Sequence, residues 1–81
     1  MDPLIERCCK GDQSFTQEEL FELIDKYRWH TATYEEISPN LIEETVVIKY
    51  GYSYFAIDVS IYDGEITLYQ PVRRYYGKPV S

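Results

Sequence analysis

The dipeptide Asp63-Gly64 lies between two runs of alternating apolar residues, and it restricts the possible folds of this chain more than any other feature. Asp-Gly is favoured in two-residue type I′ turns, which require positive φ at both central positions and join the strands of an antiparallel hairpin. The sequence therefore predicts a tight hairpin here. The strand pairs that this turn sets are Tyr62 with Glu65, Ile61 with Ile66, and Val59 with Leu68.

A second reversal is predicted at Gly51-Tyr52, with Ile48 opposite Phe55 and Val46 opposite Ile57. Side chains in a strand alternate between the two faces of the sheet. The two registers agree, because together they place the apolar residues on one face, whereas a shift of one residue would scatter them. The residues of this predicted core face are Val46, Ile48, Phe55, Ile57, Val59, Ile61, Ile66 and Leu68.

The opposite face of this meander carries three tyrosines, Tyr54, Tyr62 and Tyr69. Tyrosine is enriched among the residues that contribute most to binding at protein interfaces. We therefore regard this Tyr face as a candidate partner-binding surface. The alternative that the sequence leaves open is that the C-terminal segment or the first helix covers it.

Two helices are predicted before the sheet. The first begins at Asp2-Pro3, since Asp is a good N-cap and Pro is preferred at the first helical position, and it ends at Gly11. The second begins with a capping box in which Thr16 is the N-cap and Glu19 the N3 residue. The predicted apolar stripes consist of Leu4, Ile5, Cys8 and Cys9 in the first helix, and of Leu20, Leu23, Ile24 and Tyr27 in the second.

The predicted fold class is α+β, with two N-terminal helices packed on one face of a three- to four-stranded antiparallel β-meander. A chain of 81 residues is expected to form a single small domain, residues 1–81. Its predicted parts are a helical acidic half at 1–30, the meander at 41–70, and a tail or short final strand at 71–81. Whether residues 33–37 and 72–76 form strands is left open.

Charge is distributed unevenly along the chain. The net charge is −6; residues 1–44 hold eleven Asp or Glu and four Lys or Arg, whereas residues 45–81 hold three and four. This balance opposes binding to nucleic acid or to an anionic membrane, both of which require basic surface. It favours a protein partner with a basic groove, recognised through complementary potential. The candidate contact residues of this acidic surface are Glu18, Glu22, Asp25, Glu35, Glu36, Glu43 and Glu44.

The sequence predicts no catalytic site, metal site or cofactor. A zinc site needs about four ligands, but the chain offers one adjacent pair, Cys8-Cys9, and one histidine, His30. We expect one cysteine in the core and the other at its edge. We expect His30, like Lys26 and Arg28, in or just beyond the last turn of the second helix, where positive charge is favourable. The cysteine usage, and a start at Met1-Asp2-Pro3 without the pattern of a secretion signal, favour a reducing, cytoplasmic location.

These features favour a small acidic protein-binding domain without enzymatic activity, acting as an inhibitor or adaptor. By analogy of size and charge alone, such chains are typical of phage or mobile-element proteins that block a host enzyme or defence complex. One alternative is a structural homodimer that uses the Tyr face or an edge of the sheet. A less favoured alternative is a small enzyme that uses Cys8 or His30.

Overall fold

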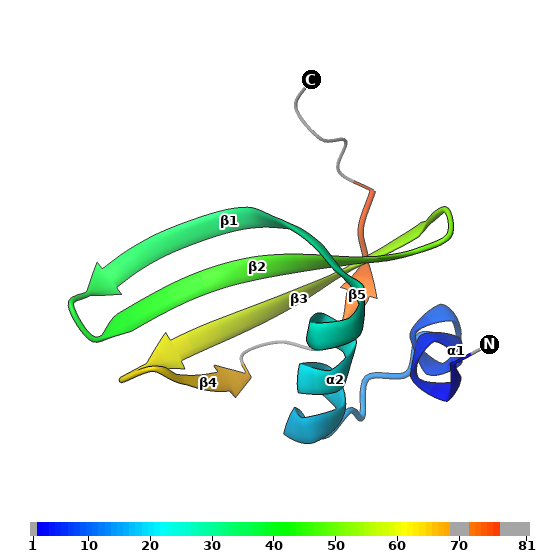
Figure 1. Cartoon of the computed structure of the whole chain (residues 1–81), viewed down its shortest axis with the longest axis horizontal. Helices are drawn as coiled ribbons and strands as arrows, with labels where there is room; N and C mark the ends of the chain where they lie inside the picture. Colours follow the sequence, from blue (N-terminus) through cyan, green and yellow to red (C-terminus); the bar gives the residue numbers. More distant parts are fainter. Residues whose placement is uncertain (1, 69–71, 77–81) are drawn as a thin grey trace.

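The computed structural model of this chain describes residues 2–68 and 72–76. Its elements are α1 (Pro3–Cys9), α2 (Gln17–Tyr27), β1 (Arg28–Ser38), β2 (Leu41–Tyr50), β3 (Ser53–Tyr62), β4 (Glu65–Leu68) and β5 (Arg73–Arg74). The fold is α+β, as predicted: two helices precede an antiparallel sheet in which β1 to β4 form a meander (Figure 1). The sheet is larger than expected, because β5 also pairs with β3, on the same edge as β4.

Local sequence determines where both helices begin. Asp2 caps α1, since its Oδ1 accepts the backbone N–H of Leu4 at 2.9 Å. At α2, Thr16 Oγ1 accepts the N–H of Glu19 at 3.1 Å, and Glu19 Oε1 accepts the N–H of Thr16 at 2.9 Å, which completes the predicted capping box. Gly11 follows α1 with a φ of +78°, the left-handed conformation in which helices commonly end.

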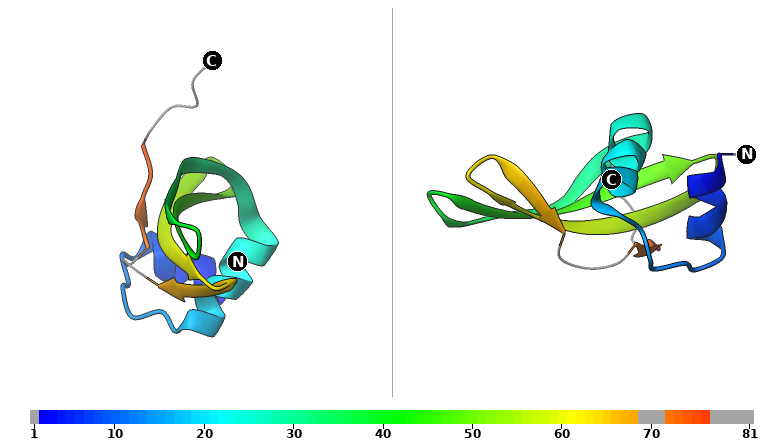
Figure 2. Two further views of the ribbon diagram at one scale, coloured as in Figure 1. Left: turned by 90° about the vertical axis from the view of Figure 1, so that its left-hand side faces the viewer. Right: turned by 90° about the horizontal axis from the view of Figure 1, so that it is seen from below.

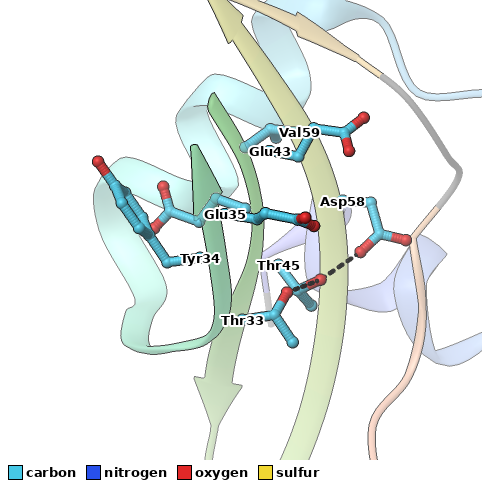
Figure 3. A pocket seen from close by; sticks show the side chains of 8 residues that line it. Thr33, Tyr34, Glu35, Glu43, Thr45, Asp58 and Val59 are labelled. Carbon is cyan, nitrogen blue, oxygen red and sulfur yellow. Dashed lines mark hydrogen bonds between the residues drawn. The ribbon is translucent and has the colours of Figure 1, made fainter. Parts of the chain in front are cut away.

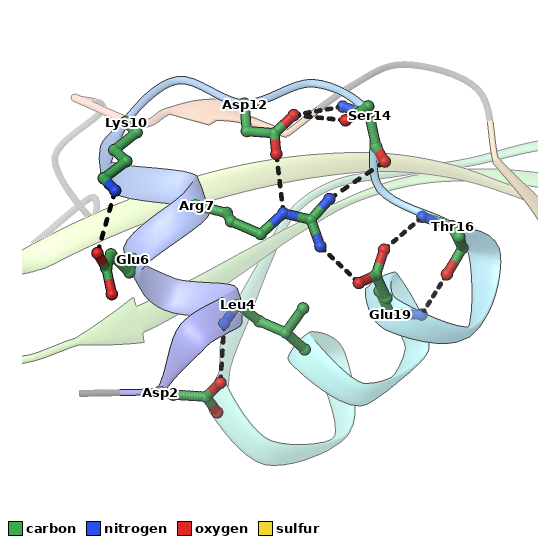
Figure 4. Close-up of polar contacts among 9 residues, drawn as sticks. All are labelled: Asp2, Leu4, Glu6, Arg7, Lys10, Asp12, Ser14, Thr16 and Glu19. Atoms are coloured by element: carbon green, nitrogen blue, oxygen red, sulfur yellow. Dashed lines mark hydrogen bonds and ion pairs between the residues drawn. The ribbon is translucent and has the colours of Figure 1, made fainter.

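Arg7 joins the two helices across the loop between them (Figure 4). Its Nε donates to Asp12 Oδ2 at 2.8 Å, and its two terminal nitrogens donate to Glu19 and to the carbonyl oxygen of Ser14. Hydrogen bonds from Ser14 and Arg7 hold the pKa of Asp12 well below its ordinary range. The backbone N–H of Thr16 and the Arg7 guanidinium lower the pKa of Glu19 in the same way. The loop therefore depends on both carboxylates being ionised.

Both predicted hairpin registers are confirmed. Ile48 pairs with Phe55 and Val46 with Ile57 between β2 and β3, and the three pairs predicted around the last turn form between β3 and β4. Asp63 and Gly64 have φ of 50° and 80°, as a type I′ turn requires.

The apolar residues of both helices share one buried cluster with the predicted core face, in which α2 contacts β1 and β2 and α1 contacts α2, so the predicted packing of the helices on the sheet is confirmed in part. Ile66 is partly buried against this core; Ile61 is only partly exposed but lies outside it, and the side chain of Leu68 lies outside the described part. Cys9 is exposed, so the apolar stripe of α1 is one residue shorter than predicted. The buried cluster consists of Leu4, Ile5, Cys8, Leu20, Leu23, Val46, Ile48, Phe55, Ile57, Val59 and Val72.

Strand β1 corrects the predicted boundaries. The helical part was expected to span 1–30, but α2 ends at Tyr27, and Arg28 is already extended, with φ −54° and ψ 129°. Arg28 pairs with Ile48 and His30 with Val47, so His30 lies in the sheet and not at the helix end. Pairing with a strand as long as β2 stabilises these residues more than a position at the helix C-terminus, which basic residues prefer. The segment 33–37 is therefore part of an eleven-residue edge strand.

The sheet extends beyond the helices. The β1–β2 and β3–β4 turns project at the end of the sheet that lies away from α1 (Figures 1 and 2). The backbone N–H of Asp63 donates to the carbonyl oxygen of Asn40 at 2.9 Å, which joins the two turns. We call residues 34–44 and 59–68 the distal arm. It begins at a row of residues in register across four strands: Tyr34, Glu44, Val59 and Leu68.

Candidate functional site

The distal arm carries carboxylates and no basic residue. Residues 34–44 and 59–68 contain six Asp or Glu and neither Lys nor Arg. One of the six, Glu44, is only 8% exposed, and its Oε2 accepts hydrogen bonds from Arg28 at 2.8 Å and from Thr31 Oγ1 at 2.6 Å. The other five form no ion pair within residues 2–68 and 72–76; they are Glu35, Glu36, Glu43, Asp63 and Glu65.

Glu35 on β1 and Glu43 on β2 lie directly opposite each other. Strand alternation places both on the outer face, which we define as the face of the sheet opposite the helical core. Like charges in such a cross-strand position destabilise a sheet. The free protein therefore keeps an unfavourable pair that a cation from a partner would relieve.

The outer face is hollowed beside this pair, with a volume of about 390 Å³ (Figure 3). A row of hydrogen bonds crosses the hollow: Thr33 Oγ1 donates to Thr45 Oγ1 at 2.8 Å, and Thr45 Oγ1 donates to Asp58 Oδ1 at 2.6 Å. Asp58 also accepts from Arg73 at 2.6 and 3.3 Å. These groups satisfy one another, whereas the carboxylates of Glu35 and Glu43 in the same hollow accept no side-chain hydrogen bond from residues 2–68 and 72–76.

Three large side chains are exposed in the same arm. Tyr34 is 56% exposed, Ile37 48% and Tyr62 56%. Tyr34 and Ile37 flank the carboxylates of Glu35 and Glu36 in the sequence of β1. Protein interfaces combine an apolar or aromatic centre with a polar rim, and a few aromatic side chains supply much of the binding energy. The distal arm has both components.

The remaining predicted acidic residues lie elsewhere. Glu18, Glu22 and Asp25 are exposed on α2, where Glu22 pairs with Lys26 at 3.3 Å. The structure therefore separates the predicted acidic surface into two parts. One is on α2; the other, on the distal arm, keeps Glu35, Glu36 and Glu43 and has Glu44 buried beneath it.

The predicted Tyr face is not continuous. Tyr54 is partly buried, with its ring centroid 4.8 Å from that of Trp29 and 5.8 Å from Lys49 Nζ. Tyr62 lies on the same strand in the distal arm, about 26 Å away at the usual rise of a strand. Tyr69 lies outside the described residues.

Residues 73–75 contact the end of the outer face next to β5. Val47 and Ala56 belong to this face, yet both are 0% exposed. The ring of Tyr75 reaches His30 at 6.2 Å between centroids, across the strands that carry these two residues, and its backbone N–H donates to the carbonyl oxygen of Tyr54 at 2.9 Å. At this end of the face, the contacts of Tyr75 favour the alternative in which the C-terminal segment covers it.

Cys8 lies in the core, as expected of one cysteine, whereas Cys9 is exposed and not at the edge of the core. Burial, and to a lesser extent the neighbouring Cys9, raise the pKa of Cys8 to about 11, so its reactive thiolate is scarce at neutral pH. His30 Nδ1 is buried without a hydrogen-bond partner in the described part of the chain. In the same part, no group of three or more His, Cys, Asp or Glu is arranged to hold a metal ion.

No protein-family model, curated protein or solved structure was found to match this chain. Among the described residues, no helix is long and apolar enough to cross a membrane. The functional interpretation therefore depends on the geometry of the distal arm.

The predicted binding residues did not include Tyr34, Ile37 or Trp29. One feature of the sequence could have placed these three residues on a strand. The turn at Ser38-Pro39-Asn40 precedes a long apolar strand, and an antiparallel hairpin requires a partner of similar length on the other side of its turn. A partner strand of that length extends the sheet back through residues 28–37 and places these side chains on an edge strand.

Proposed function

We propose that this chain is a small acidic protein-binding domain that acts as an inhibitor or adaptor, and that the distal arm is its docking surface. One observation carries the proposal. The arm exposes Tyr34, Ile37 and Tyr62 beside five carboxylates that no cation in the described part of the chain neutralises. A partner that fits this surface has a basic groove with an apolar centre.

The two components of the arm have different effects on binding. Unpaired carboxylates attract a basic partner over distance and raise the rate of association, whereas buried aromatic and apolar side chains slow dissociation. A phage or mobile-element origin, with a host enzyme or defence complex as the target, stays an analogy of size and charge.

The proposal is tested by affinity capture with three baits: the wild-type chain, the arm variant Glu35→Lys/Glu43→Lys, and the control Glu18→Lys/Asp25→Lys. Both variants change the net charge by the same amount, but the control places the change on α2. We expect a polypeptide from the source organism that the wild-type and control baits retain, that the arm variant loses, and that added salt releases. A partner that the arm variant retains equally would refute the proposal.

A homodimer is the second candidate, and the open edge of β1 in the described sheet favours it. The net charge of −6 opposes self-association at low salt. Sedimentation at micromolar concentration separates the two candidates, since a strict monomer at both low and high salt removes the homodimer.

A further inference from the structure

β1 is the outermost strand of the described sheet, paired on one side with β2 alone. The other side of an edge strand presents unpaired N–H and C=O groups, which another extended chain can bind. Register irregularities interrupt β1 between Arg28 and His30, between Thr31 and Thr33, and between Glu36 and Ser38. Residues 33–36 form the longest uninterrupted ladder between two such irregularities, so this stretch, about 13 Å long, is the part of β1 most regular for the addition of a strand.

We propose that residues 33–36 of β1 bind an extended segment of the partner by β-strand addition, and that this segment alternates basic and apolar residues. This inference rests on the proposed function, because it specifies how the distal arm binds. In such complexes the main-chain hydrogen bonds fix the geometry, and alternate side chains determine which sequence is accepted.

The outer face of this stretch selects for a basic side chain. Glu35 points to that face with Glu43 directly behind it on β2, one strand spacing or about 4.8 Å further in. An added strand places one residue beside Glu35 on its free side. A Lys or Arg at that position meets the unpaired carboxylates of both strands, and its long side chain reaches toward the hollow between them.

The inner face selects for an apolar side chain at the neighbouring position. Tyr34 points to this face and is 56% exposed, and Ile37, at the irregularity beyond Glu36, is 48% exposed. An apolar residue of the added strand beside Tyr34 would bury part of its ring. The two faces together define a segment in which lysine or arginine alternates with a β-branched or aromatic residue.

A second copy of this chain fits the same edge poorly. If residues 33–36 of two copies paired antiparallel about a two-fold axis, opposite residues would share a face, so Glu35 would face Glu35 of the second copy and Tyr34 would face Glu36. This arrangement brings four carboxylates to the edge and no Lys or Arg, so it adds repulsion where a basic strand relieves it.

The experiment uses the full chain and an acetylated, amidated heptapeptide that alternates valine and lysine. Two further peptides are N-methylated, one at every valine and the other at every lysine. N–H groups of alternate residues point to opposite edges of a strand, so one peptide loses the N–H groups that would donate to β1 and the other keeps them all. Binding is followed by amide chemical shifts and by amide hydrogen exchange of β1.

We expect the unmethylated parent peptide and one methylated peptide to bind. The other methylated peptide should bind at least about tenfold more weakly, since several main-chain hydrogen bonds are lost. Binding should slow exchange at alternate amides of residues 33–36. Glu35→Lys should lower the affinity of the parent peptide by about tenfold, while the control Asp25→Lys should not.

Three results would each overturn the strand-addition inference: equal binding of both methylated peptides, protection from exchange outside β1, or no binding of the unmethylated peptide. The proposed function would survive each of these results if affinity capture still depends on Glu35 and Glu43. If sedimentation shows a dimer, and the same β1 amides are protected from hydrogen exchange without peptide, the edge binds a second copy of this chain.

Discussion

Replacing Glu43 with glutamine is expected to stabilise the free protein and to weaken its binding to a basic partner. Glutamine keeps the length and the polar end of the side chain, and it removes one of the two charges that face each other across β1 and β2. The two effects have opposite signs because the repulsion that destabilises the free sheet is the same potential that attracts a cation.

The size of the stabilisation follows from the geometry of the pair. Directly opposite side chains on one face start about 5 Å apart and splay outward. At about 7 Å in water, Coulomb's law gives roughly 0.6 kcal/mol, and screening at about 0.1 M salt reduces this to roughly 0.3 kcal/mol. The usual range for like charges in this position extends to about 1 kcal/mol. For a domain of this size, a gain of about 0.5 kcal/mol raises Tm by roughly 2–4 °C.

Thermal and urea unfolding of wild-type and Glu43→Gln at low and high salt measure this effect. The difference should shrink at about 1 M salt, where the screening length falls to about 3 Å. Glu18→Gln is the matched control, because Glu18 lies in the first turn of α2, where the helix dipole favours a negative charge. It should be neutral or slightly destabilising. A Glu43→Gln protein that is less stable than wild type would show that repulsion between Glu35 and Glu43 does not destabilise the sheet.

Three further predictions concern other contacts. Iodoacetamide at about pH 8 should label Cys9 in the native protein and Cys8 only after unfolding, because burial raises the pKa of Cys8 to about 11; two adducts on the native protein by mass spectrometry would contradict this. Tyr75→Ala should lower the free energy of unfolding by about 1 kcal/mol, because it uncovers the outer face, whereas Tyr76→Ala, at a side chain that is 82% exposed, should have little effect. Asp12 and Glu19 have a folded-state pKa below the ordinary value of about 4, so they contribute stability that is complete above that pH and lost as the pH falls through the lowered values. Urea unfolding between about pH 7 and pH 2 should therefore show a smaller loss for Arg7→Gln than for wild type, and equal losses would show that Arg7 is not the cause.

The parts of the fold that the sequence could predict are those that short-range chemistry determines. The Asp63-Gly64 turn requires positive φ at two adjacent residues, and the Thr16–Glu19 capping box satisfies backbone groups within one helical turn. Because each of these features depends on neighbours in the chain, it could be recognised without knowledge of the rest of the fold. The registers of the β2–β3 and β3–β4 pairs could then be predicted from the positions of the two turns.

The parts that the sequence did not predict depend on partners that are distant in the chain. Arg28 leaves the helix because Ile48 offers it a strand to pair with. Tyr54 is partly buried because Trp29, at an irregularity of β1, lies against it. Val47 and Ala56 are buried on the outer face where the ring of Tyr75 reaches His30 from the far end of the chain. No local pattern indicates these contacts.

The same limit applies to the candidate site. Glu35, Glu36 and Glu43 were recognised as surface carboxylates, but Glu44, next in the chain, could not be distinguished from them. The structure buries Glu44 because strand alternation turns it toward Arg28 and Thr31. Only the strand register shows that Glu35 and Glu43 face each other and that Tyr34 and Ile37 lie on the edge strand of the described sheet.

Calorimetry over a range of salt concentrations can compare the affinity of the captured partner for the wild-type protein and for the arm variant Glu35→Lys/Glu43→Lys. We expect the arm variant to bind at least about tenfold more weakly than wild type at low salt, equivalent to about 1.4 kcal/mol, and the difference to shrink as salt is added. The α2 control with the same net charge should bind like wild type. Equal affinities of the wild-type and arm-variant proteins at low salt would contradict the claim that the distal arm is the docking surface.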